Sequence, residues 1–395
     1  MCPLSLRAAA TMLALTAAPA FAACPAANQY NFLFSSQANA TLAYGSTYTY
    51  TATTSGGATQ TFTVGFTQNG LSSTTVGGEV RPNISTSHNG GTGANSLVVG
   101  GVLPSRTLDI AGASQAMVTT LTFPIPVRDV TFTMYDVDFG ANQFRDWIMI
   151  RGFGSATYTG SHTTPFATNN GVGPYSNASS SLNLGPVATP FTISAQQAVG
   201  VSVADNATNT GSVTVSFVQP ATSVEIRYGN YPLTSGETAT GQQAFGISGV
   251  SFCPMPNVTL TKTSAPWSDP INGTTNPKMV PGADLIYTLT VANANTSPVD
   301  LSTTVLTDPL PAAVSFFNGD IDDAGPVTTN YEFAAGTSGL TFGAPNLTYS
   351  NNGGASYSYI PAAGYDAAVN ALRFAPAGSM AANSSFTLRF RARIK

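Results

Sequence analysis

The chain has 395 residues and a mass of 40.5 kDa, and only 8 % of its residues are charged, against roughly 25 % in an ordinary soluble domain, which argues against a cytosolic housekeeping enzyme. Its 14 Lys and Arg against 18 Asp and Glu give a net charge of −4, which has the wrong sign for an electrostatic nucleic-acid binder. The 38 Gly and 26 Pro beside 43 % hydrophobic residues are typical of short strands joined by many turns, so we expect an all-β fold.

The first 22 residues have the pattern of a signal peptide. Arg7 supplies a basic start, residues 8–18 form a short apolar stretch, and Ala20-Phe21-Ala22 is the small-x-small pattern that signal peptidase cleaves. We place the cleavage after Ala22 and expect an exported protein, extracellular or at the cell surface. The alternative is a lipoprotein signal ending at Cys24, although Phe21 stands where such signals usually carry Leu. No later apolar run approaches the roughly 20 residues that span a bilayer, so we expect no membrane span.

The cysteines predict one disulfide. Cys2 would leave with the signal peptide, and the remaining Cys24 and Cys253 lie at the two ends of one long segment. In an oxidising compartment these two are expected to pair, which marks the segment between them as a single domain. Two unpaired buried thiols are the alternative.

The segment 24–255 carries a repeated alternation of apolar and polar residues, as in half-buried strands. The apolar positions are Tyr48, Tyr50, Phe62, Val64, Phe66, Leu121, Phe123, Val130, Phe132, Met134, Val213, Val215, Phe217, Val224, Ile226 and Tyr228. Glycine-rich turns separate these runs, for example at residues 55–57 and 89–91. We expect one large β-sandwich here.

Acidic residues follow the strand that ends near Met134. Asp136 and Asp138 are two apart, so they share the face that Met134 turns toward the core. Together with Asp146, Asn142 and loop carbonyls they would supply the oxygen ligands that calcium requires. The alternative needs no metal: the carboxylates would accept hydrogen bonds from loop N–H groups or pair with arginines. The candidate arginines are Arg128, Arg145 and Arg151.

The domain boundary is expected at Cys253-Pro254-Met255-Pro256-Asn257, because two prolines in three residues stiffen the chain and block strand pairing. The second domain, 257–395, is expected to be a smaller β-sandwich. Its strands are predicted at residues 258–262, 285–291 and 385–395.

The last of these strands alternates apolar residues with cations. The cations are Arg389, Arg391, Arg393 and Lys395. They could form a binding patch, but we interpret them as a solvated face that discourages edge-to-edge pairing of sheets. Residues 320–325 have acidic residues at the first and third positions of a calcium loop, yet Ala324 and Tyr331 occupy ligand positions, so a solvated acidic loop is expected.

Three ordered motifs in the second domain resemble a known family. They are Leu260-Thr261-Lys262-Thr263, residues 280–293 (VPGADLIYTLTVAN) and Leu306-Thr307-Asp308-Pro309-Leu310-Pro311. The segment is similar to the conserved repeat domain of unknown function found in bacterial surface and secreted proteins. The resemblance implies an immunoglobulin-like sandwich, usually present in tandem copies, whereas this chain has one.

The first domain has a looser resemblance to the jelly-roll, lectin-like modules of bacterial fibrillar adhesins. It is carried by Thr122-Phe123, Pro126-Val127, residues 130–138 (VTFTMYDVD), Asp146-Trp147-Ile148 and Gly152. The resemblance implies a jelly-roll-like sandwich and a binding role.

Catalytic motifs are sparse. The chain has two histidines, His88 and His162, and neither an H-E-x-x-H nor a G-x-S-x-G motif. One enzyme hypothesis remains, a polysaccharide hydrolase that uses Asp136 and Asp138 as its carboxylate pair. Both project from one strand end rather than across a cleft, so we expect no enzyme.

We therefore expect a secreted or cell-surface adhesion protein that binds a glycan or a surface protein through its first sandwich. The alternative is a structural surface or matrix component without a specific ligand. Calcium is the one cofactor considered, and no nucleic-acid partner is expected. Four tyrosines of the second domain could stack on sugars or occupy core and rim positions of its sandwich. They are Tyr349, Tyr357, Tyr359 and Tyr365.

Overall fold

The computed structural model describes residues 24–107, 109–140, 143–154, 158–162, 180–181, 192–193, 197–200, 203–217, 220–231, 241–295, 297–323 and 327–395. The chain divides after Met255 into two compact units, Ala23–Met255 and Pro256–Lys395. Each unit is described below by itself. The predicted signal peptide, residues 1–22, lies outside the described residues.

The expectation of an all-β fold is confirmed. Among the described residues, the helical elements are 3-10 turns of three residues each, η1 (Ala26–Asn28), η2 (Phe34–Ser36) and η3 (Ala344–Asn346). In the same part of the chain, no helix is long and apolar enough to cross a membrane.

The strands of the first unit are β1 (Tyr30–Leu33), β2 (Ala40–Thr41), β3 (Thr47–Thr53), β4 (Thr59–Asn69), β5 (Thr75–Val76), β6 (Glu79–Val80), β7 (Asn83–Ser85), β8 (Ser96–Leu103), β9 (Ala116–Tyr135), β10 (Phe139–Gly140), β11 (Phe144–Gly154), β12 (Tyr158–His162), β13 (Ser180–Ser181), β14 (Thr192–Ile193), β15 (Gln197–Val199), β16 (Val213–Phe217), β17 (Ala221–Asn230), β18 (Gly241–Ile247) and β19 (Gly249–Pro254). The strands of the second unit are β20 (Val258–Ser268), β21 (Asp284–Asn293), β22 (Leu306–Pro309), β23 (Val314–Asn318), β24 (Tyr331–Ala334), β25 (Leu347–Ser350), β26 (Gly364–Asp366), β27 (Ala371–Phe374) and β28 (Ser384–Ile394).

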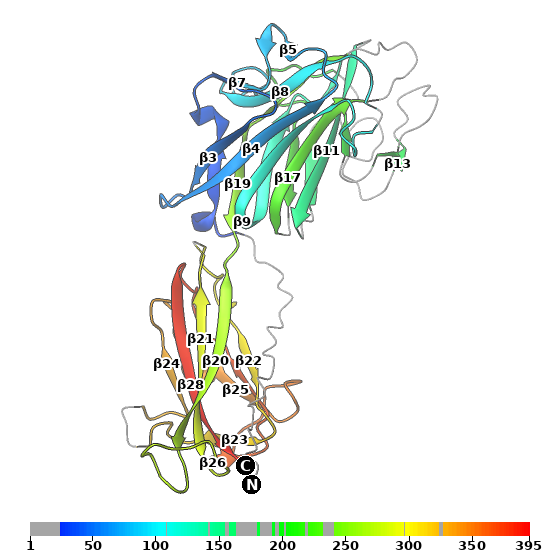
Figure 1. Cartoon of the computed structure of the whole chain (residues 1–395). Helices are drawn as coiled ribbons and strands as arrows, with labels where there is room; N and C mark the ends of the chain where they lie inside the picture. Colours follow the sequence, from blue (N-terminus) through cyan, green and yellow to red (C-terminus); the bar gives the residue numbers. More distant parts are fainter. Residues whose placement is uncertain are drawn as a thin grey trace. The chain divides into compact units, whose positions relative to one another are not determined.

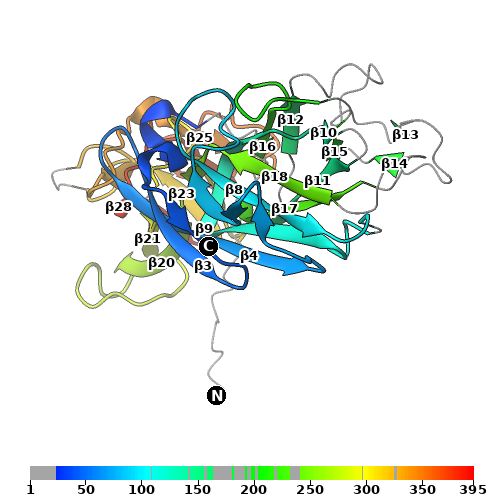
Figure 2. The ribbon, with the colours of Figure 1, turned by 90° about the horizontal axis from the view of Figure 1, so that it is seen from above.

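The long strand β9 connects the two layers of the first unit. Its first part, as far as Thr122, pairs with β4 on one side and β17 on the other. From Val127 onward it pairs with β16 and β19, and at its end with β18. Pro124 and Pro126 lie between the two parts and have no N–H to donate to a ladder, so the partners can change there. As a result β3 and β4 lie in one layer and β8 and β18 in the other (Figures 1 and 2).

The inward positions of these strands build one aromatic-rich core. Phe62 and Phe252 are at most 1 % exposed and pack edge to face, and Phe32 and Phe123 contact the same cluster. Burial of one such side chain contributes about 1.5–3 kcal/mol to stability, and each aromatic pair about 0.5–1.5 kcal/mol more. The apolar positions predicted from the period-2 pattern are therefore the ones that hold the layers together.

A disulfide joins Cys24 to Cys253, with their Cα atoms 6.1 Å apart. Because β1 and β19 are antiparallel neighbours, with Tyr30 opposite Phe252, the bridge lies at the end of an existing strand pair. Closing so long a loop lowers the conformational entropy of the unfolded chain. In chain-entropy models this stabilises the folded unit by about 5 kcal/mol.

The second unit is a sandwich of two sheets (Figure 1). The larger sheet has the order β20-β21-β28-β23-β26, with β24 also paired to β28, and the smaller has the order β22-β27-β25. Leu289 and Phe390 from the larger sheet meet Leu372 and Phe374 from the smaller one in the core, and all four are fully buried.

Candidate functional site

The predicted acidic residues Asp136, Asp138 and Asp146 do converge in the first unit. Asp136 and Asp138 come directly after β9, and Asp146 lies on β11. Their exposed fractions are 5 %, 5 % and 0 %. Asn142, the fourth predicted ligand, lies outside the described residues.

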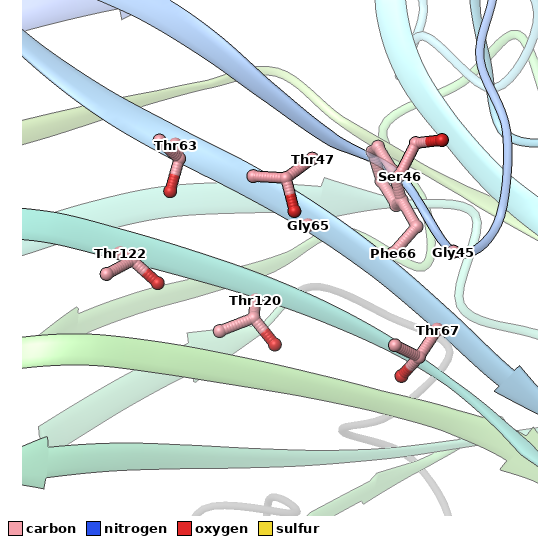
Figure 3. Close-up of a pocket in the computed structure, with 9 residues that line it drawn as sticks. All are labelled: Gly45, Ser46, Thr47, Thr63, Gly65, Phe66, Thr67, Thr120 and Thr122. Carbon is pink, nitrogen blue, oxygen red and sulfur yellow. The ribbon is translucent and has the colours of Figure 1, made fainter.

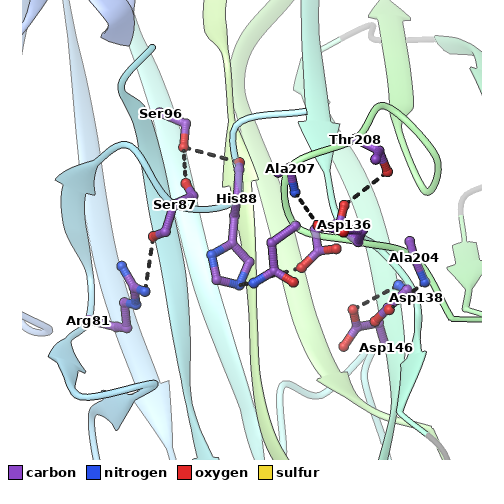
Figure 4. A network of polar contacts seen from close by, with 12 residues as sticks. Arg81, Ser87, His88, Ser96, Asp136, Asp138, Asp146, Ala204, Ala207 and Thr208 are labelled. Carbon is purple, nitrogen blue, oxygen red and sulfur yellow. Dashed lines mark hydrogen bonds and ion pairs between the residues drawn. The ribbon is translucent and has the colours of Figure 1, made fainter. Parts of the chain in front are cut away.

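Backbone N–H groups and one tyrosine hydroxyl donate hydrogen bonds to these carboxylates, and Figure 4 shows those from the N–H groups of Asp138 and Ala204. The Asp138 N–H donates to Asp146 Oδ2 at 2.9 Å, and the Tyr228 hydroxyl donates to Asp146 Oδ1 at 2.6 Å. The Ala204 N–H donates to Asp138 Oδ2 at 2.8 Å. The backbone of Gly200 passes so close that a Cβ there would lie 1.7 Å from the Asp138 carbonyl oxygen. The cluster therefore fastens the chain after β9 to β11, to Gly200 and to Ala204.

His88 joins this cluster, although no sequence pattern indicated that it would. Its Nε2 lies 3.4 Å from Asp136 Oδ2 and 3.2 Å from Asn206 Nδ2. Both side chains are more than nine-tenths buried, and Asp136 Oδ1 and His88 Nδ1 have no hydrogen-bond partner among the described residues. A histidine 48 positions upstream in a polar loop carries no motif that would link it to Asp136.

Burial decides the charge of this cluster. It raises the pKa of Asp136 to about 8, with the charges of Asp138 and Asp205 adding to the effect. Burial also raises the pKa of Asp138 to about 6, against the lowering effect of backbone N–H groups, and raises the pKa of Asp146 well above its ordinary value. Burial, and then the charge of Arg81, lower the pKa of His88 to about 4. At neutral pH the contact between His88 and Asp136 is therefore one between uncharged groups.

The candidate arginines make contacts of their own. Arg145 donates to the Gly200 carbonyl at 3.1 Å and lies over the ring of Phe139, and Arg128 lies 4.0 Å from Asp129. Arg151 reaches the Ala111 carbonyl. Within the described part of the chain, no three His, Cys, Asp or Glu side chains form a group that could hold a metal ion. Because Asn142 is outside that part, calcium at these aspartates stays a prediction.

A second feature of the first unit is a face of threonines that was not predicted from the sequence. The outward positions of three neighbouring strands, β3, β4 and β9, carry threonines at every second residue. They are Thr47, Thr49, Thr51, Thr53, Thr59, Thr61, Thr63, Thr67, Thr120 and Thr122. The register places Thr49 beside Thr63 and Thr63 beside Thr122, so the side chains form rows across the sheet. We call these ten residues the threonine face.

The threonine face is interrupted by Gly65, and a hollow of about 230 Å³ lies there (Figure 3). Gly65 is paired with Thr47 on β3 and with Thr120 on β9, so its missing side chain leaves a gap between two threonines. Thr63, Thr67 and Thr122 complete the polar lining, together with Ser46. None of the lining residues is charged, and among the described residues none of these threonine hydroxyls makes a side-chain hydrogen bond within the protein.

The sequence did contain a signal for this face. The stretches TYTYTAT at 47–53 and TQTFTVGFT at 59–67 place Thr at alternate positions. The same alternation that identified the buried Tyr and Phe residues also fixes a uniform outer surface. Which strands lie side by side, and where a glycine opens the surface, follow only from the register.

The cations of the last strand were expected on a solvated face that discourages edge pairing, but the strand is not an edge and Arg391 is buried. β28 is an interior strand, paired with β21 on one side and with β24 and β23 on the other. Arg391 is 5 % exposed and donates to Asp284 and Asp323, and Arg393 donates to Asp284 as well. Arg389 pairs with Glu332. The expectation was wrong because sequence alone did not reveal that Asp284 lies opposite Arg393 in the register.

The four tyrosines do not form one surface. Tyr349 and Tyr359 pack against the core of the second unit. Tyr365 lies 4.7 Å from Phe317, ring to ring, and beneath Arg393. Tyr357 lies beneath Arg373.

The Asp323 carboxylate belongs to the acidic loop predicted at residues 320–325. It is 60 % exposed and accepts a hydrogen bond from Arg391.

No family model matches the chain, and no curated protein is significantly similar to it. The resemblances to the conserved repeat domain and to the lectin-like modules therefore stay predictions. The first unit therefore offers two candidate features, the aspartate cluster and the threonine face.

Proposed function

We propose that this protein is a secreted or cell-surface adhesion protein that binds a glycan through the threonine face of its first sandwich. The observation that carries the proposal is the uncharged hollow at Gly65, lined by threonine hydroxyls. Each hydroxyl can both donate and accept a hydrogen bond, which matches the hydroxyl groups of a sugar. The threonine methyl groups offer apolar contact to the C–H faces of the same sugar.

The buried aspartates support the proposal less well than the hollow does. At 5 % exposure or less, Asp136, Asp138 and Asp146 cannot contact a polysaccharide unless the fold opens. Their hydrogen bonds tie loop segments to β9 and β11, so we assign them a structural role. The signal peptide pattern and the disulfide support an oxidising, exported location.

The test is glycan-array binding by the full chain and two variants. Gly65→Thr continues the strand alternation and fills the hollow, because a Cβ at this position meets only Thr47 Oγ1, at 3.2 Å. Thr51→Val changes the same face outside the hollow. We expect wild type and Thr51→Val to bind the same glycans, and Gly65→Thr to lose about tenfold or more in affinity. No glycan bound, or equal binding by Gly65→Thr, would favour the structural matrix component instead.

A further inference from the structure

One lysine and one carboxylate meet inside the second unit. Lys262 lies on β20 of the larger sheet, and Asp308 lies on β22 of the smaller sheet. The Lys262 Nζ lies 2.6 Å from Asp308 Oδ1, so the contact connects the two layers of the sandwich. On β20 the side chains of Leu260, Lys262 and Ser264 alternate with exposed threonines, which places the lysine on the inward side of its strand.

The surroundings of this pair are apolar. The Asp308 side chain is 1 % exposed and that of Lys262 is 21 % exposed. The Lys262 Nζ lies 4.5 Å from the ring centroid of Tyr287 and 5.7 Å from that of Phe390. Asp308 Oδ2 is buried and has no hydrogen-bond partner among the described residues. Burial raises the pKa of Asp308 despite the lysine beside it, so the uncharged carboxylic acid is favoured more than in water.

We propose that Lys262 and Asp308 react with one another to form an amide bond between the two sheets. The contact places the nucleophile beside the carboxyl group, which replaces a bimolecular encounter by an intramolecular one. A proton passes from the ammonium group to the carboxylate, and in an apolar site this neutral pair avoids the cost of two buried ions. The Nζ lone pair then attacks Asp308 Cγ.

The step balances without any further reactant. The bond that forms joins Nζ to Cγ, and the bonds that break are one Cγ–O bond and one N–H bond. The departing oxygen leaves as water, carrying the hydroxyl hydrogen and one hydrogen from Nζ. Nothing is oxidised or reduced, and the protein becomes lighter by one water molecule.

The other two lysines of the chain have different surroundings. Lys278 donates to the Asn276 side chain at an exposed position, and Lys395 donates to the Ala312 carbonyl, also at an exposed position. Arg391 does touch a buried carboxylate, that of Asp284, but a guanidinium does not lose its proton in proteins and so is no nucleophile. Lys278 therefore serves as the matched control.

The experiment is peptide mass spectrometry of the full chain, reduced, denatured and digested with trypsin. An intact Lys262 gives separate fragments 228–262, 263–278 and 279–373. The amide predicts instead one species that joins 228–278 to 279–373 and is lighter by one water than the two together. We expect it in wild type and in Lys278→Arg, and expect it to be absent in Lys262→Arg and Asp308→Ala.

Separate fragments of full mass from wild type would overturn the proposal. This measurement on wild type decides the question even if a variant does not fold. It is also independent of glycan binding, because the pair lies in the second unit and the threonine face in the first.

Discussion

Replacing Asp284 by Asn should destabilise the second unit strongly. Asp284 is 1 % exposed and accepts hydrogen bonds from Arg391, Arg393 and Tyr365. Burial by itself raises the pKa of Asp284, but the bonds from Arg393, Tyr365 and Arg391 outweigh it and hold the pKa below its ordinary value. The aspartate is therefore the counter-ion for a buried guanidinium, and the asparagine would leave that charge without it.

The size of the effect follows from the exposure of the two arginines. Removing one partner of a buried ion pair costs about 3–5 kcal/mol. The Arg393 side chain is 41 % exposed, so water compensates part of its loss, and Arg391 keeps its contact with Asp323. We therefore expect the low end, about 3 kcal/mol. The exposed pair of Arg389 and Glu332 provides the control, because Glu332→Gln should cost at most about 1 kcal/mol.

The chain offers a clean assay for this comparison. Its two tryptophans are divided between the units, Trp147 in the first and Trp267 in the second. In a Trp147→Phe background, urea unfolding followed by fluorescence reports on the second unit alone. If Asp284→Asn and Glu332→Gln were to lose the same stability there, the buried ion network would not support this unit as argued.

Four further predictions concern the first unit. Because the pKa of Asp136 in the folded protein is about 8, the free energy of unfolding of the first unit should fall by about 2 kcal/mol as pH rises from 6.5 to 8. Asp136→Asn should flatten this slope in urea titrations, and an unchanged slope would contradict the prediction. Because the pKa of His88 in the folded protein is about 4, the stability that its uncharged form contributes to the first unit should be lost as pH falls from 6.5 through 4. His88→Gln should reduce this loss of stability. Reduction of the Cys24–Cys253 bridge should lower the melting temperature of this unit by several degrees and leave the second unit unchanged. If calcium binds, chelator should lower the same melting temperature and added calcium raise it, whereas no response to either would remove calcium from the account.

Period-2 alternation was sufficient to predict the all-β class and most of the core. Phe62, Val64 and Phe66 are buried as the pattern required, because an amphipathic strand has one way to face an apolar interior. The alternation around residues 121–134 also predicted buried positions correctly. It did not reveal that they belong to one strand shared by both layers, since the change of partners at Pro124 and Pro126 depends on which strands lie beside it.

The candidate sites were harder to predict because they depend on contacts between distant residues. Asp136, Asp138 and Asp146 were recognised since they are close in sequence. His88 was not placed with them, and Asp284 was not placed with Arg391 and Arg393, because register and layer packing bring these groups together. The hollow was missed for the same reason: Gly65 opens the sheet only because its neighbours across the ladders are threonines.

Glycan binding at the threonine face is best tested by an NMR titration of the full chain with the glycan that binds best on the array. We expect the amide shifts to gather at the hollow, on Gly45, Gly65, Thr67 and Thr120, which line it together. Shifts that gather elsewhere, or no shifts at saturating glycan, would contradict the claim that the threonine face is the binding surface.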